Sequence, residues 1–296
     1  MSVIIIVDLS QVMLSNIMMQ IGNHTNAVIE ESMVRHMVLN SLRLLKLKFS
    51  AEYGELVIAC DSKNYWRRKI FPYYKANRKK SQAASELDWK AIFECLNKIR
   101  EEIKVHFPYR VIDIETAEAD DVIGTLCMHY GAQEDDWSFM NLNNQEKILI
   151  LSADKDFQQL QLFTNVEQYD PIRKRFLKCE DPKKFLQEHV LKGDTGDGIP
   201  NVLSSDDCFV VGRRQTPLRQ KKMEQLIDGE LVEGSEYFRN YLRNRELIDL
   251  QMIPRELQDK ILSSFEAQRG KKPDHLFDYF IAHKLKNLTE SIGDFV

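Results

Sequence analysis

Val3-Ile4-Ile5-Ile6-Val7-Asp8 is an apolar run that ends in a carboxylate. Leu56–Cys60 is a similar short run ending at Asp61, and Lys147–Leu151 is a third, followed closely by Asp154. Strands that are apolar throughout and separated by helical segments are typical of a parallel sheet covered on both faces. We therefore predict an α/β fold, with a mostly parallel central sheet flanked by helices.

The rest of the chain supports this fold and suggests a division near residue 180. Tyr109–Ile114 and Val166–Tyr169 are two further predicted strands. Apolar residues recur at helical spacing in the segments between the strands, which are Glu31–Phe49, Glu86–Val105 and Glu118–Tyr130. Beyond residue 180 the pattern is mainly helical. We expect residues 1–180 to form the α/β core and residues 181–296 to form a smaller, mainly helical region.

The composition is that of a globular protein without a membrane segment. The 296 residues are 43% hydrophobic, and no run approaches the roughly 20 apolar residues that a membrane helix needs. The apolar N-terminus is short and is not preceded by basic residues, so it does not resemble a signal peptide. We expect a cytoplasmic protein that does not associate with membranes.

Nine carboxylates lie where the predicted fold can bring them together. Asp8, Asp61 and Asp154 follow three predicted strands, and ligands of open α/β sheets bind at the carboxyl edge. The other six stand at a helix start, beside Asp154 or in a glycine-rich loop: Glu118, Asp120, Asp121, Asp156, Asp194 and Asp197. Any one of them could simply cap a helix or a turn. Three acids within four residues, however, repel one another unless a cation lies between them.

The residue types favour a hard cation bound by oxygen ligands. The five cysteines are scattered without a CxxC pair, and the seven histidines form no HExxH motif, so zinc and disulfides are not expected. Carboxylates suit magnesium or manganese. Two such ions can stabilise both the attacking and the leaving oxygen of a phosphodiester. The sequence therefore predicts two-metal hydrolysis of phosphodiesters.

A basic and aromatic segment, residues 62–85, follows the second acidic strand end. It has no acidic residue before Glu86 and carries eight cations: Lys63, Arg67, Arg68, Lys69, Lys75, Arg78, Lys79 and Lys80. Five aromatic residues are interleaved with them, and rings can stack on bases while cations follow phosphates. A solvated loop whose aromatics pack on the core is the alternative. A second basic cluster around Arg213 and Arg214 could hold duplex backbone or form a solvated helix face.

These motifs resemble the 5′-nuclease family, which includes flap endonucleases and the 5′–3′ exonuclease domains of bacterial DNA polymerases. The resemblance covers most of the chain, and within the family it is strongest to the ribonuclease H branch of T-even-like phages. It rests on five motifs in order: IIIVD at residues 4–8, WRR…PYYKANR at 66–78, AEADD at 117–121, SADKDF at 152–157 and GDTGDGIPNV at 193–202. Its PIN-like fold agrees with the predicted sheet.

The resemblance implies a role for each motif. Asp8, Asp61, Glu118, Asp120 and Asp121 would surround a first Mg²⁺, and Asp154, Asp156, Asp194 and Asp197 a second, with Mn²⁺ as a substitute. In the arch, residues 62–85, Lys75, Arg78 and Arg67 would contact the scissile phosphate, Tyr74 would stack on a base, and Arg68 and Lys79 would bind nucleic acid.

The resemblance also implies an activity and its setting. It implies a monomer that cleaves RNA–DNA hybrids, 5′ flaps and duplex DNA during lagging-strand replication, with a single-stranded-DNA-binding protein and a sliding clamp as partners. One motif departs from the family. The glycine-rich segment that grips duplex backbone in many members is replaced here by residues 203–214. The departure leaves open whether the helical grip, and any potassium site in it, is present, and we expect Arg213, Arg214 and nearby lysines to take over backbone binding.

Two other interpretations remain open at this point. A phosphatase of the haloacid-dehalogenase type also places an aspartate after its first strand, but it needs a D-x-D there and this chain has Asp8-Leu9-Ser10. A non-catalytic binder of branched DNA could share the scaffold, but such proteins lack metal ligands that are present here. Cleavage of a small phosphomonoester, or binding without cleavage, would distinguish these interpretations.

Overall fold

The computed structural model of this chain describes residues 4–21, 30–85, 87–132 and 147–296. It contains a six-stranded sheet in the order β3-β2-β1-β4-β5-β6. The strands are β1 (Ile4–Asp8), β2 (Glu55–Ala59), β3 (Arg110–Ile112), β4 (Ile148–Leu151), β5 (Val166–Asp170) and β6 (Arg175–Leu177). The first five are parallel, and β6 pairs antiparallel with β5. The predicted α/β fold with a mostly parallel sheet is confirmed, and β6 is an addition at one edge.

Each face of the sheet is covered by its own set of helices, because successive strand residues point to opposite faces. Ile5 and Val7 belong to one core, and Ile4 and Ile6 belong to the other. The first core packs against α1 (Leu9–Ile21), α2 (Glu31–Tyr53), α5 (Trp89–His106), α11 (Leu276–Ala282), α12 (Lys286–Thr289) and the 3-10 helix η5 (Ile292–Phe295). The second packs against α6 (Ala119–Tyr130), α10 (Arg255–Ala267), η2 (Lys155–Leu162) and η4 (Leu250–Met252).

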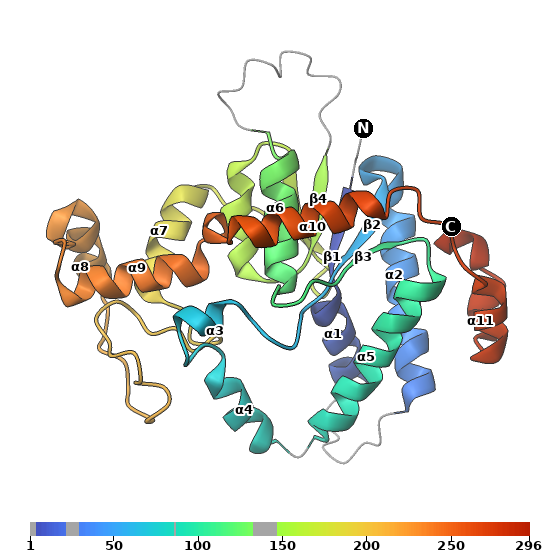
Figure 1. The fold of residues 1–296 in the computed structure, drawn as a ribbon, viewed down its shortest axis with the longest axis horizontal. Coiled ribbons are helices and arrows are strands. Elements are labelled where there is room, and N and C mark those ends of the chain that lie inside the picture. The colour runs from blue at the N-terminus through green and yellow to red at the C-terminus, as the bar shows by residue number, and fades with distance from the viewer. Residues whose placement is uncertain (1–3, 22–29, 86, 133–146) are drawn as a thin grey trace.

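The helices after residue 180 are divided among these cores and a third group. α7 (Pro182–Lys192), α8 (Gln220–Gln225), the π-helical turn η3 (Leu226–Glu230) and α9 (Glu236–Ile248) lie together at one end of the molecule (Figure 1). α10 crosses the sheet, and α11 lies at the opposite end (Figure 1). Residues 181–296 are mainly helical, as predicted. The last of these helices, however, pack on the sheet and complete its two cores.

The basic segment forms an arch anchored to the third group of helices. It contains α3 (Arg67–Ile70) and α4 (Ala76–Ala83), with α4 projecting away from the sheet (Figure 1). Phe71 and Tyr74 pack with Val190, Ile199 and Leu247 in a small cluster of their own. The base of the arch is therefore part of the packed structure. Among the described residues, no helix is long and apolar enough to cross a membrane.

Candidate metal centre

Four carboxylates from separate parts of the sequence line one cavity at the carboxyl edge of the sheet. β1 pairs with β2 on one side and with β4 on the other, so the residues that end these strands are neighbours. Asp8, Asp61, Asp120 and Asp154 line a cavity of about 680 Å³. The predicted convergence of the strand-end acids is what the structure shows.

Backbone amides and one hydroxyl hold these carboxylates in place. Asp8 accepts a hydrogen bond from the Gln11 amide at 3.0 Å and one from Ser152 Oγ at 3.2 Å. Asp61 Oδ1 accepts from the first amide of α6 at 2.9 Å. Asp154 Oδ1 accepts from the amide two residues later at 3.0 Å. Asp8 and Asp154 are thus oriented by amides just after their own strands, and Asp61 by the start of α6.

Burial and neighbouring carboxylates raise the pKa of three of the acids that line the cavity. Burial, followed by repulsion from Asp61, raises the pKa of Asp8 to about 7. Burial and Asp156 raise the pKa of Asp154 to about 6. Burial and Asp154 also raise the pKa of Asp120 well above its ordinary value. A divalent cation among these oxygens would offset both causes, so the donor set fits a hard metal ion.

Glu118 and Asp121 lie behind the cavity and are held by the arch. Both side chains are fully buried. Arg67 Nη1 lies 2.8 Å from each of them, and Lys75 forms a further ion pair with Glu118. Asp121 also accepts from the indole of Trp66 at 3.1 Å and closes a capping box at the start of α6. Their negative charge is balanced by side chains of the chain itself.

Arg67 and Tyr74 contact the buried acids and are not directed toward a nucleic acid. The Arg67 guanidinium is only 2% exposed and also donates to the carbonyl of Leu247. The Tyr74 ring is buried, with its hydroxyl 3.0 Å from oxygens of Glu118 and Asp197. In this conformation neither side chain is placed for the predicted contact with a phosphate or a base. Two buried acids require a counter-charge, which Arg67 and Lys75 supply, while the Tyr74 hydroxyl adds a hydrogen bond.

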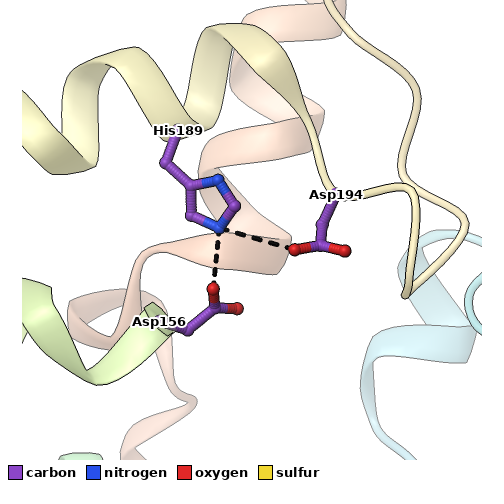
Figure 2. A group of neighbouring side chains, drawn as sticks. All are labelled: Asp156, His189 and Asp194. Atoms are coloured by element: carbon purple, nitrogen blue, oxygen red, sulfur yellow. Dashed lines mark hydrogen bonds and ion pairs between the residues drawn. The ribbon is translucent and has the colours of Figure 1, made fainter. Parts of the chain in front are cut away.

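A second group contains a histidine that the sequence motifs did not single out. Asp156, His189 and Asp194 each offer a ligand atom within 4.8 Å of the others. His189 Nε2 lies 2.9 Å from Asp156 Oδ1 and 3.7 Å from Asp194 Oδ2 (Figure 2). Lys155 Nζ lies 2.8 Å from the same oxygen of Asp194. His189 belongs to the last turn of α7, immediately before the acidic loop. That proximity to Asp194 is a local signal, but it does not reveal the contact with Asp156.

The two aspartates of the glycine-rich loop, Asp194 and Asp197, point in different directions. Gly193 has φ 66°, and an isolated bridge joins Asp194 to Ile199. Asp194 faces His189, whereas Asp197 faces the arch. There it lies 2.6 Å from Arg78 Nη2 and 3.5 Å from Lys75 Nζ.

The remaining predicted nucleic-acid contacts fall into two places. Lys75 and Arg78 line the carboxylate cavity, and Arg68 covers the ring of Tyr65 at 4.8 Å from its centroid. The side chain of Lys79 lies outside the part that the structure describes. Arg213 and Arg214 are exposed on a loop, where Arg213 pairs with an aspartate at 2.9 Å, and neither lines that cavity.

Comparisons with known proteins agree with this geometry. Residues 10–190 match the family model described as 5′-3′ exonuclease, N-terminal resolvase-like domain, and residues 184–295 match the model of the C-terminal part of T4 RNase H. The chain is 32% identical to the ribonuclease H of Enterobacteria phage T4, over 99% of this chain and 95% of that protein.

Further similarity extends to flap endonucleases. The chain is 32% identical to flap endonuclease Xni of Shewanella woodyi, over 46% of this chain and 49% of that protein. Among solved structures, it superposes on the bacteriophage T5 D15 flap endonuclease in a pseudo-enzyme-product complex with DNA and metal ions. The TM-score is 0.60 at 19% identity, over 90% of this chain and 98% of that one. That structure shows the shared fold.

Proposed function

Because this chain belongs to the 5′–3′ exonuclease family and is a nuclease, we propose that it cleaves phosphodiesters with two bound Mg²⁺ ions, which Mn²⁺ could replace. Its substrates would be RNA–DNA hybrids, 5′ flaps and duplex DNA. The observation that carries the proposal is the cavity in which Asp8, Asp61, Asp120 and Asp154 meet, where burial and repulsion from neighbouring carboxylates raise the pKa of Asp8 and Asp120.

The acidic side chains of the site would have two different roles in the reaction, metal binding and positioning. Bound cations would lower the pKa of an attacking water and neutralise charge on the phosphate. Asp8, Asp61, Asp120 and Asp154 would hold one cation, while Asp156 and Asp194 would help to hold the other. The buried pairs made by Glu118 and Asp121 with Arg67 assign these two acids and the arginine to positioning the start of α6.

Lys75 and Arg78 are the cations that line the cavity, and we propose that they meet the phosphate. Arg78 is half-exposed, whereas Lys75 is buried and would act from its ion pair with Glu118. Burial alone would lower the pKa of Lys75, but Asp197 and Glu118 raise it, so the ammonium stays charged. A fixed positive charge beside the carboxylates stabilises charge that develops on phosphate oxygens. We assign this role to Lys75 and Arg78.

Nucleic acid would extend from the cavity in two directions. An adjoining cavity of about 510 Å³ lies between α1, the arch and α5, and its lining includes Lys63, Arg68, Arg100 and Trp89. Cations with an aromatic ring suit a single strand. We assign duplex binding to the helical region after residue 180, including Arg213 and Arg214. We propose that the reaction belongs to lagging-strand replication in the cytoplasm, and that the chain acts as a monomer with a single-stranded-DNA-binding protein and a sliding clamp as partners.

The test uses an RNA primer annealed to DNA and labelled at its 5′ end. We expect short labelled products with Mg²⁺ and intact primer with a chelator. Asp120→Asn should abolish or greatly reduce cleavage while the fold is kept, because it removes one charge from the cavity. Asp278→Asn, at an exposed carboxylate on α11, is the matched control and should cleave normally. Near wild-type turnover by Asp120→Asn would contradict the assignment.

The arch has a separate test. Lys75→Ala should slow single-turnover cleavage more than it weakens binding of the hybrid, if Lys75 stabilises charge in the transition state. Loss of binding with unchanged cleavage of bound substrate would instead make Lys75 a backbone anchor.

A further inference from the structure

We propose that His189 is a direct ligand of the second cation, so that this site combines an imidazole with carboxylates and takes transition-metal dications such as Mn²⁺ or Co²⁺ in preference to Mg²⁺. The inference rests on the proposed two-cation function. It adds a nitrogen ligand and a metal preference to a site that the motifs describe with oxygen ligands alone.

The three side chains have the spacing of ligands around one ion. Neighbouring ligands of an octahedral ion lie about 3 Å apart and opposite ligands about 4 Å apart, for bonds of about 2.1 Å. His189 Nε2 lies 2.9 Å from Asp156 Oδ1 and 3.7 Å from Asp194 Oδ2. Figure 2 shows an oxygen of each carboxylate facing the same imidazole nitrogen. An ion could therefore be bound with small side-chain adjustments.

A backbone hydrogen bond fixes the position of His189 relative to the acidic loop. His189 is buried in the last turn of α7, where its ring packs beside that of Phe185, with centroids 5.7 Å apart. Its carbonyl accepts from the amide of Gly193 at 2.9 Å, and Gly193 immediately precedes Asp194. The imidazole is therefore positioned by the same residue that ends the helix and starts the loop.

The ammonium of Lys155, which is paired with Asp194, can leave this group when a metal ion binds. Lys155 pairs with Asp194 Oδ2, but its side chain is 53% exposed. A long exposed lysine can move its ammonium into solvent at little cost. His189 is 6% exposed and has no such freedom. Binding of a dication would displace the lysine and keep the histidine.

Ligand chemistry then sets the metal preference. Imidazole binds first-row transition metals more readily than it binds Mg²⁺, which favours oxygen and keeps its water. The competing role for His189 is to donate a hydrogen bond that orients Asp156 without touching the metal. The two roles differ in whether a histidine nitrogen is bonded to the ion.

Pulsed electron paramagnetic resonance of bound Mn²⁺ answers that question without any cleavage assay. The full chain is loaded with Mn²⁺ in the absence of nucleic acid, with ordinary histidine and with ¹⁵N-histidine. We expect a directly bonded nitrogen coupling that changes with the ¹⁵N label. Mn²⁺ bound without a histidine coupling would overturn the proposal even if every variant folded poorly, because the wild-type chain alone gives this result.

Variants and titration calorimetry test the metal preference. His189→Gln keeps a hydrogen-bond donor for Asp156 but removes the imidazole, and His283→Gln, at a histidine on the opposite side of the molecule, is the control. We expect His189→Gln to lose the coupling and about tenfold in Mn²⁺ affinity, with a much smaller change for Mg²⁺. Equal losses for both ions would overturn the preference. Failure of Mn²⁺ to bind the chain at all would instead contradict the proposed function.

Discussion

Replacing Asp8 with asparagine should make the metal-free protein more stable at alkaline pH while destroying its cleavage activity. Burial and repulsion from Asp61 raise the pKa of Asp8 from 3.8 to about 7. Each pKa unit is worth about 1.4 kcal/mol, so ionised Asp8 costs the folded state up to about 4 kcal/mol. Asparagine removes the charge and can still accept from the amide of Gln11. We expect the free energy of unfolding to rise by about 2–4 kcal/mol near pH 8.

The pH dependence gives the sign of the effect. A carboxyl whose pKa is higher in the folded protein binds protons more tightly there than in the unfolded chain. The free energy of unfolding of the wild type should therefore fall as pH rises from about 4 to about 7. The Asp8→Asn variant lacks this contribution, so the difference between the two should be small near pH 4 and largest above pH 7.

Urea denaturation in a chelator, repeated across this pH range, measures both curves. Asp170→Asn is the matched control, because Asp170 is also buried but accepts from two backbone amides and faces Arg173. Asp170→Asn should not raise the free energy of unfolding. Saturating Mg²⁺ should stabilise the wild type more than Asp8→Asn, since binding to the folded state adds to stability. A variant that is less stable than the wild type at every pH would refute the reasoning.

Three further predictions concern other parts of the site. Arg67→Ala should lower the free energy of unfolding by about 3–5 kcal/mol, as measured in urea, because it leaves two buried carboxylates without their shared partner; a loss below about 1 kcal/mol would contradict that pairing. Gly193→Ala should weaken Mn²⁺ binding in calorimetry, because a φ of 66° is strained for alanine and the added Cβ would lie 2.4 Å from a carbonyl oxygen of the loop that carries Asp194. An unchanged Mn²⁺ affinity would contradict a role of this loop geometry in metal binding. Replacing Arg213 and Arg214 with alanine should reduce the slope of hybrid affinity against salt concentration by about one for each phosphate that these arginines bind, and an unchanged slope would exclude them from the interface.

The strand-end acids could be predicted from sequence because their convergence follows from local patterns. Asp8, Asp61 and Asp154 each end or follow an apolar strand, and parallel strands bring such positions to one edge whatever the rest of the chain does. The helix start that carries Asp120 was recognised by composition alone. These features needed no knowledge of long-range packing.

The partners of the acids could not be predicted in the same way. Arg67 precedes Glu118 by 51 residues, and their pairing depends on how the arch folds back onto α6. His189 follows no metal-binding spacing in sequence and meets Asp156 only because α7 packs against η2. The amphipathic pattern of α10 and α11 predicts helices but does not say which core their apolar faces will complete.

The connection between the arch and the acidic loop has a mechanical consequence. The amide of Lys75 donates to the carbonyl of Asp197 at 2.7 Å, and the side chain of Asn77 donates to the carbonyl of Thr195 at 2.7 Å. Both bonds involve backbone carbonyls of the loop, so they persist when charges are screened. The two bonds tie the foot of the arch, including the first turn of α4, to the loop that carries Asp194 and Asp197. A substitution at Asn77 would therefore disturb the loop as well as the arch, whereas substitutions in the last turn of α4 would leave both bonds in place.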